Sequence, residues 1–444
     1  MKTSNYKRNL AAAVVTASLG FSMVVEAAVS ADEAARLGAE LTPFGAERNG
    51  NDSGTIPAWS PEPMAIEKVL QDEPEFTITA ANYLQYTDQL IPGLEAMFEK
   101  YPDSFKMNVY PTRRTHRMPQ WVYDNIRENA TEATLVAGGN GVEGAYGGTA
   151  FPIPESGEEL IWNHITRWRG EGQSSDVAAY GVYSDGNITY TRNQVEQKYT
   201  YYQEGQEDQW DGLNGFYFQE TVEPSRRSGE LLLLHEPMNP GLEPRKAWQY
   251  IPGQRRVRRA PTVAYDTPTP TSNGMAVFDE TFHFNGALDR YDWTLVGKQE
   301  VFMPYNDNRF INAVDEGVEV EELFTAGHPN PDFRRWELHR AWVVEATLKE
   351  GKRHVYAKRR FYIDEDSWTV VMSEAYDGRG DLWKVNYGSP YYAEELPGVV
   401  VSGNIYQDLL SGHYYVHPYT RETFHKGGED DFYSTQNLRR QARR

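Results

Sequence analysis

Apolar and polar side chains alternate along the chain from about residue 180 onward, which predicts β-strands with one buried face. The block 336–387 shows this pattern best. Turn residues interrupt it at 349–352, 364–367 and 377–380. Four strands joined by tight turns predict an antiparallel meander. The apolar positions of the block are Trp336, Leu338, Trp342, Val344, Ala346, Leu348, Val355, Ala357, Phe361, Ile363, Trp368, Val370 and Met372.

Earlier segments show the same period and bring the total to about twelve predicted strands. Few helical patterns separate them, and parallel neighbours would need helical crossovers. We therefore expect a mainly β (α+β) fold with a large, curved antiparallel sheet. The earlier strand candidates are 182–192, 197–203, 213–222, 230–236, 246–251, 255–260, 277–284 and 293–302.

The first third of the chain has helical signals instead. Ser30 with Glu33 and Ser156 with Glu159 match the capping box that begins a helix. The apolar positions 161, 165 and 168 then fall on one helical face. We expect short helices, including 79–90 and 118–128, that cover one face of the sheet.

The N-terminus has the order of a secretory signal peptide. Lys2, Lys7 and Arg8 precede an apolar run from Leu10 to Val25, and the small residue Ala27 follows. The run is shorter than the roughly 20 residues of a membrane-spanning helix. We expect cleavage after Ala27 and a periplasmic protein. The expected organisation is a signal peptide (1–27), a helical, loop-rich region (28–175), a β half-barrel forming one cooperative domain with it (176–436) and a frayed basic tail (437–444).

Composition narrows the choice of partners. The chain has no cysteine, so disulfides and thiolate chemistry are excluded. Its formal net charge of −20 argues against nucleic acid and anionic membrane surfaces as partners. We expect no stable membrane insertion, because no later stretch is apolar enough to span a bilayer.

Motifs for catalysis or cofactors are weak. Residues 139–144 match G-x-G-x-x-G, but the Pro-containing segment 151–154 that follows cannot be the helix of a dinucleotide site. His413 and His417 are either a metal site or an exposed polar pair. The acidic turn 364–366 either binds a cation or is a plain hairpin turn. We expect no catalytic residue, cofactor or metal.

Two sets of residues are candidates for ligand binding. Arg255, Arg256, Arg258 and Arg259 form a basic cluster in an acidic chain. They would pair with Asp and Glu on neighbouring strands, or form a basic rim for an anionic head group or an acidic partner. The aromatic strand residues would form a core or line a cavity. The candidate ligand-binding residues are Trp248, Tyr250, Trp293, Trp342, Phe361, Trp368, Trp383, Arg256 and Arg258.

Four long segments resemble an uncharacterised family of exported Gram-negative proteins, a domain of unknown function often labelled outer membrane lipoprotein-sorting protein. The segments are MNVYPTRRTHRMPQWVYDNI (107–126), AWQYIPGQRRVRRAP (247–261), FNGALDRYDWTLVGKQEVFMPYN (284–306) and RRFYIDEDSWTVVMSEAYDGRGDLWKVNYG (359–388).

The resemblance implies a Lol-type lipoprotein-carrier fold, an open half-barrel with helices over its concave face. It also implies a link to an inner-membrane export pump and an outer-membrane channel-like protein, and it carries over no catalytic residue. Three functions stay open: a periplasmic carrier of a lipid-like ligand, a non-enzymatic accessory subunit of the pump or channel, and, from the many Asp and Glu residues alone, a hydrolase with paired carboxylates. The carrier is the function we expect.

Overall fold

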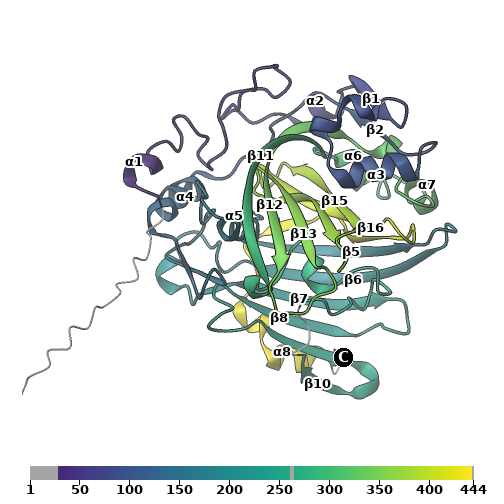
Figure 1. Cartoon of the computed structure of the whole chain (residues 1–444). Coiled ribbons are helices and arrows are strands. Elements are labelled where there is room, and N and C mark those ends of the chain that lie inside the picture. The colour runs from purple at the N-terminus through teal and green to yellow at the C-terminus, as the bar shows by residue number, and fades with distance from the viewer. Residues whose placement is uncertain (1–28, 261–264, 443–444) are drawn as a thin grey trace, which may run out of the picture.

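The computed structural model describes residues 29–260 and 265–442, and most of its strands join one 16-stranded sheet (Figure 1). All pairs are antiparallel except one parallel bridge between β2 and β12. The order is β1-β2-β12-β13-β14-β15-β16-β17-β5-β6-β7-β8-β9-β10, with β11 on β12 and β18 on β5. Strands β3 and β4 form a separate hairpin. This architecture confirms the mainly β fold class.

The strands have the following bounds: β1 Phe76–Thr79, β2 Lys106–Val109, β3 Thr134–Val136, β4 Gly141–Glu143, β5 Gly172–Val182, β6 Ile188–Lys198, β7 Leu213–Glu223, β8 Leu231–Pro237, β9 Lys246–Ile251, β10 Arg256–Arg259, β11 Tyr291–Pro304, β12 Trp336–Leu348, β13 Lys358–Asp364, β14 Val370–Tyr376, β15 Leu382–Ala393, β16 Gly398–Asp408, β17 Tyr414–Tyr419 and β18 Thr423–His425. The helices are α1 Ala31–Ala34, α2 Ile66–Leu70, α3 Pro92–Lys100, α4 Gln120–Glu132, α5 Gly157–Ile165, α6 Asn308–Asn312, α7 Val320–Leu323 and α8 Thr435–Gln441.

The predicted meander is present as β12–β15. The register places Val344 opposite Phe361, and Phe361 opposite Ser373, so these side chains share one face of the sheet. Its strands are buried almost throughout. In Figure 1 β12, β13 and β15 run steeply through the view while β5–β8 cross it, so the sheet twists strongly between its two halves.

Helices of the N-terminal region pack on the meander half of the sheet. Helix α3 lies against β15, and α5 lies against β11 and β12. The apolar residues of these helices belong to the same core as the meander strands; Leu94, Phe98 and Leu160 are fully buried there. Both predicted capping boxes form, at Ser30 and at Ser156.

Several predicted elements are wrong in kind. Residues 79–90 form two short 3₁₀ turns, because Tyr83 and Tyr86 stack in separate directions, on Phe98 and Phe76. Segment 197–203 leaves β6 after Lys198 and is not a strand; its buried Tyr202 contacts Trp121 of α4 and Trp168. Segment 277–284 is not a strand either.

The chain ends also differ from expectation. The predicted frayed tail enters α8, where Asn437 and Leu438 are buried. The predicted signal peptide lies outside the described residues. In the part of the chain that the structure describes, no helix combines the length and apolar character needed to cross a membrane.

Candidate ligand-binding cavity

A cavity of about 700 Å³ lies against one face of β5–β9. The strand register builds its floor, because cross-strand partners point to the same face. One row runs through Ser175, Val195, Gln219, Leu232 and Gln249, each directly opposite the next. All five line the cavity.

Residues 265–289, here called the covering segment, form the opposite wall. The backbone–backbone hydrogen bonds of its described residues join residues of the segment to one another; an example is Thr269 N to Ala276 O at 3.0 Å. Phe282 and His283 have φ of 53° and 70°. These left-handed conformations explain why the alternation at 277–284 did not become a strand.

Buried charges fasten the covering segment to the meander. Asp279 Oδ1 lies 3.2 Å from Arg359, and Asp279 Oδ2 lies 3.0 Å from His354. Glu280 lies 3.5 Å from the Lys384 ammonium. Burial alone would raise the pKa of Asp279, but Arg359 and His354 outweigh it and hold that pKa below its ordinary value.

The lining of the cavity is amphipathic. Its apolar side chains include Val177, Val195, Leu232, Leu234, Phe282 and Phe284. Its neutral polar side chains include Gln173, Gln197, Asn214, Gln219, Thr221 and Gln249. A ligand with both an apolar body and a polar end fits such walls.

Four arginines of the described chain also line the cavity. Two are neutralised: Arg227 lies 2.7 Å from Glu230, and Arg245 lies 2.7 Å from Glu236. Arg167 and Arg169, which follow α5, have no carboxylate partner among residues 29–260 and 265–442. Burial and the charge of Arg169 lower the pKa of Arg167.

Two further titratable groups of the lining have shifted pKa values. Burial raises the pKa of Glu422 to about 7, although its carboxylate accepts a hydrogen bond from the Tyr391 hydroxyl. Burial lowers the pKa of His417 to about 4, and its ring stacks on Tyr415. His417 is thus a cavity residue and not half of an exposed pair with His413, whose ring contacts Tyr183.

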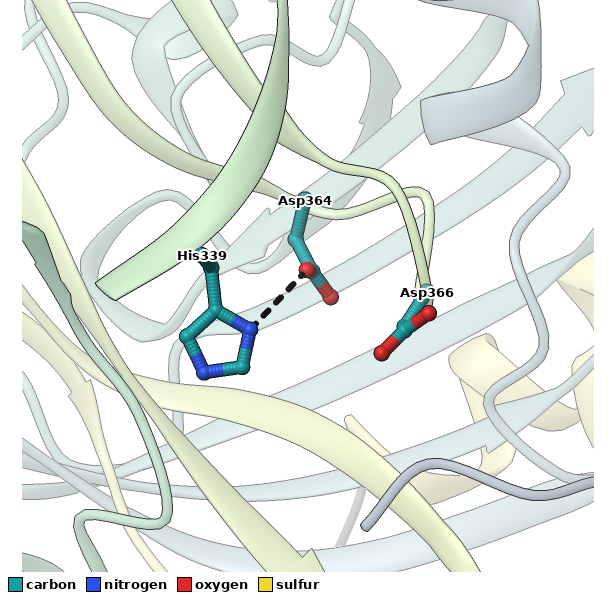
Figure 2. Close-up of side chains that lie close together, drawn as sticks. All are labelled: His339, Asp364 and Asp366. Atoms are coloured by element: carbon teal, nitrogen blue, oxygen red, sulfur yellow. Dashed lines mark ion pairs between the residues drawn. The ribbon is translucent and has the colours of Figure 1, made fainter. Parts of the chain in front are cut away.

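A second group of titratable residues lies at the predicted acidic turn between β13 and β14. His339, Asp364 and Asp366 place one ligand atom each within 4.8 Å of one another, and all are buried. Figure 2 shows the His339 ring facing Asp364, with Asp366 on the turn beyond. His339 Nδ1 is 3.8 Å from Asp364 Oδ1. These residue types also bind metal ions.

The donors around this cluster favour a structural network over a metal centre. Asp366 accepts two hydrogen bonds from Arg114, at 2.9 and 2.6 Å. Asp364 Oδ2 accepts from Tyr305 at 3.0 Å and from the Ser367 hydroxyl at 2.6 Å. A metal ion would have to displace the Arg114 donors from Asp366, while Asp364 Oδ1, which faces His339, has no hydrogen-bond partner in the described structure. Burial and the nearby Asp366 charge raise the pKa of Asp364 to about 6.

None of the nine ligand-binding candidates from the sequence lines this cavity. Phe361 and Trp368 are fully buried in the main core, and Trp293 packs on Phe284 and Phe361. Trp383 bonds Asp408 at 2.9 Å, and the ring of Trp342 lies under Lys298. Their role as ligand-binding residues stays a prediction without support from the cavity.

Trp248 and Tyr250 lie on the reverse face of β9. There they join a small core with Phe216, Leu233 and Leu438, which α8 covers. The alternation of strand side chains therefore sends Gln249 to the cavity and its two aromatic neighbours away from it.

Arg256 and Arg258 lie exposed on β10, at the end of the strand order. Their cross-strand partners are Ile251 and Gln249, and no ion pair of either arginine is found in the described structure. Of the two alternatives for the cluster, pairing with Asp and Glu on neighbouring strands is therefore not found for Arg256 and Arg258 in the described structure.

Sequence reasoning missed Arg167 and Arg169. The available signal was the pair of arginines around Trp168, directly after a predicted apolar helix. It was easily overlooked because a helix end commonly carries basic residues. Sequence reasoning also missed the covering segment and Glu422. Both lie at the cavity only because segments that are distant in the sequence pack together in the fold.

Fold and cavity together define a curved-sheet protein with a covered internal space of ligand size. A family model described as protein of unknown function (DUF1329) matches residues 77–439, and the chain belongs to that family. An uncharacterized protein of Pseudomonas aeruginosa is 44% identical over 406 residues, which cover 88% of each chain. The family resemblance of the four sequence segments is thereby confirmed.

The comparison with solved structures gives matches of low sequence identity over part of the chain. A DUF1329 family protein from Desulfovibrio piger matches with a TM-score of 0.43 and 16% identity, over 63% of this chain and 96% of the other. A LolA superfamily protein from Nitrosomonas europaea matches with a TM-score of 0.39 and 14% identity, over 64% of this chain and 100% of the other.

Proposed function

We propose that the protein is a periplasmic carrier that holds a lipid-like amphiphile in the cavity and passes it across the cell envelope. The observation that carries this proposal is the covered, amphipathic cavity of about 700 Å³. Its size falls in the range of about 300–1,000 Å³ typical of small-molecule sites. Burial of an acyl chain contributes about 25 cal/mol per Å² of apolar surface. The basic and apolar N-terminal residues support export.

The proposed role is binding without catalysis. The lining includes Glu422, whose pKa is raised to about 7, and His417, whose pKa is lowered to about 4. The Glu422 carboxyl accepts a hydrogen bond from the Tyr391 hydroxyl and the His417 ring stacks on Tyr415, so both groups are held by structural contacts.

Native mass spectrometry of protein purified from the periplasm, followed by organic extraction, tests the carrier. We expect a stoichiometric apolar adduct on the wild type. Leu232→Trp fills the cavity floor and should remove the adduct. Leu410→Trp, at a side chain that is 67% exposed, is the matched control and should retain it. An apo mass that persists after incubation with mixed envelope lipids would reject the proposal.

One observation favours a second function, docking to an envelope export pump or channel. Strand β10 ends the sheet order and presents Arg256, Arg258 and Arg259 to solvent. Exposed, unpaired arginines suit an acidic partner surface. Cross-linking in whole cells should capture such a transporter with the wild type and with the exposed control Arg379→Glu. It should fail with the double variant Arg256→Glu/Arg258→Glu; equal capture by all three proteins would reject docking through β10.

A further inference from the structure

The surroundings of Arg167 and Arg169 distinguish them from the other arginines of the cavity. Arg167 is only 4% exposed, and its guanidinium donates to the carbonyl oxygen of His164. Arg169 Nε is buried without a hydrogen-bond partner. Both guanidiniums lie near the Phe282 ring, the charge of Arg169 acts on Arg167, and burial of unpaired charge is strongly unfavourable.

Aromatic faces compensate these cations only in part. The guanidinium carbons lie 5.5 and 5.9 Å from the centre of the Phe282 ring, and that of Arg169 lies 4.5 Å from the centre of the Tyr199 ring. Cation–π contacts stabilise a charge but satisfy few of the five N–H donors of a guanidinium. Donors therefore remain for a further partner at the cavity wall.

We infer that Arg167 and Arg169 bind the anionic head group of the cavity's ligand, a carboxylate or a phosphate, while the apolar walls hold its chain. The inference rests on the proposed carrier function and names the class of its cargo. Arginine forks match the geometry of both head groups. An oxyanion between them would complete their hydrogen bonding and neutralise their charge.

The chain's own carboxylates do not occupy this place. Glu422 is the buried acid of the cavity, but it bonds Tyr391 and neither arginine. Glu230 and Glu236 are held by Arg227 and Arg245. Within the described residues, the two arginines are thus left for an external anion.

Displacement of the uncharged fluorescent probe N-phenylnaphthylamine from the purified protein tests the inference. The competitors are palmitic acid, 1-palmitoyl lysophosphatidic acid and methyl palmitate, which share a chain and differ in the head group. We expect at least one anionic competitor to bind roughly tenfold more tightly than the ester. The tighter of the two anions identifies the head group as carboxylate or phosphate.

Variants then locate the head group. Arg169→Gln should bring the anion and the ester to within about threefold of each other, with ester affinity unchanged, and Arg169→Lys should restore part of the preference. Arg379→Gln removes an exposed arginine outside the cavity, so it should keep the preference. Unchanged thermal unfolding of each variant controls for folding.

Two results would overturn the inference in different ways. If acid and ester displace the probe equally well from the wild type, the head-group assignment fails and the carrier function survives. If neither the probe nor any competitor binds, both fail. Because the first comparison uses only the wild type, it holds even if Arg169→Gln does not fold.

Discussion

Arg114 joins two segments that are distant in the sequence. Its guanidinium bonds both oxygens of Asp366, lies 3.5 Å from Glu365 and donates to the Glu47 carbonyl at 2.8 Å. Arg114 and Asp366 are 3% and 1% exposed. Burial would raise the pKa of Asp366, yet Arg114 holds it below its ordinary value. The pair therefore remains ionised in the interior.

Removal of Arg114 should destabilise the protein strongly. Arg114→Ala leaves the Asp366 carboxylate buried without its partner, and broken buried pairs cost about 3–5 kcal/mol. Urea unfolding monitored by circular dichroism measures the loss. The control is Arg36→Ala, which breaks an exposed pair with Glu40; exposed pairs contribute less than about 1 kcal/mol. Similar small losses in both variants would contradict the buried-network interpretation.

Glu422 makes stability depend on pH near neutrality. Its pKa rises from 4.5 to about 7 on folding, so the folded state binds more protons than the unfolded state between these values. Stability contributed by the protonated group is therefore present below pH 4.5 and lost as pH rises through 7. At about 1.4 kcal/mol per pKa unit, the full effect is roughly 3 kcal/mol.

Glu422→Gln should remove this dependence while keeping an acceptor for Tyr391. We expect the variant to gain stability relative to the wild type as pH rises from 5 to 8, measured as the difference in unfolding midpoints. Asp307 and Asp364, whose pKa values rise to about 6, titrate in both proteins and cancel in that difference. A difference that does not change with pH would contradict the shift.

Helix α8 shows how packing orders a segment that its sequence leaves ambiguous. Leu438 is its fully buried side chain and packs with Phe216 and Leu233 behind the cavity floor. Ser434 caps the helix through Asn437 N at 3.1 Å. A basic tail with one leucine gives no helical period, so its burial depends on the distant strands β7 and β8.

Leu438→Ala should destabilise the C-terminal core by about 2–5 kcal/mol, because it leaves a cavity against the sheet. Thermal unfolding measures the change. Trp248 fluorescence should shift to longer wavelength if α8 detaches, since Trp248 belongs to this core. Arg439→Ala alters an exposed neighbour on the same helix and should change neither observable. An intact midpoint for Leu438→Ala would mean that α8 does not stabilise the sheet.

A strand or helix could be predicted where the sequence pattern that specifies it lies within the element itself. The meander 336–387 was predicted because period-two alternation and turn residues lie within the strands themselves. Strand β16 was not predicted, since all but its last residue is buried and its sequence lacks alternation. The covering segment looked like a strand at 277–284, and its left-handed residues leave no mark in the hydrophobic pattern.

The cavity belongs to the whole molecule. Its walls come from the end of α5, from β5–β9, from the covering segment and from Glu422 near the C-terminus. The large antiparallel sheet followed from sequence, but the residues that line the cavity did not. Aromatic residues such as Trp368 pack in the core instead, whereas glutamines and unpaired arginines line the cavity. Only the pairing of strands in three dimensions distinguishes these two roles.

We expect entry to the cavity to depend on motion of the covering segment, and the contacts that fasten this segment to the meander should resist that motion. Its own backbone bonds can remain intact on opening, so the buried contacts of Asp279 and Glu280 with the meander resist the motion. We expect hydrogen exchange in the ligand-free protein to be faster in 265–289 than in β12–β15, as for a locally opening unit.

Asp279→Asn should accelerate exchange in 265–289 and leave β12–β15 unchanged, because it weakens the bonds to Arg359 and His354 but not the meander ladder. The exposed control Asp208→Asn should match the wild type. A bound amphiphile should slow exchange in the segment of all three proteins, since ligand binding stabilises the closed state. If the segment exchanged as slowly as β12–β15 and ignored both the variant and the ligand, entry would have to occur elsewhere, and the covering segment would be a fixed wall of the cavity.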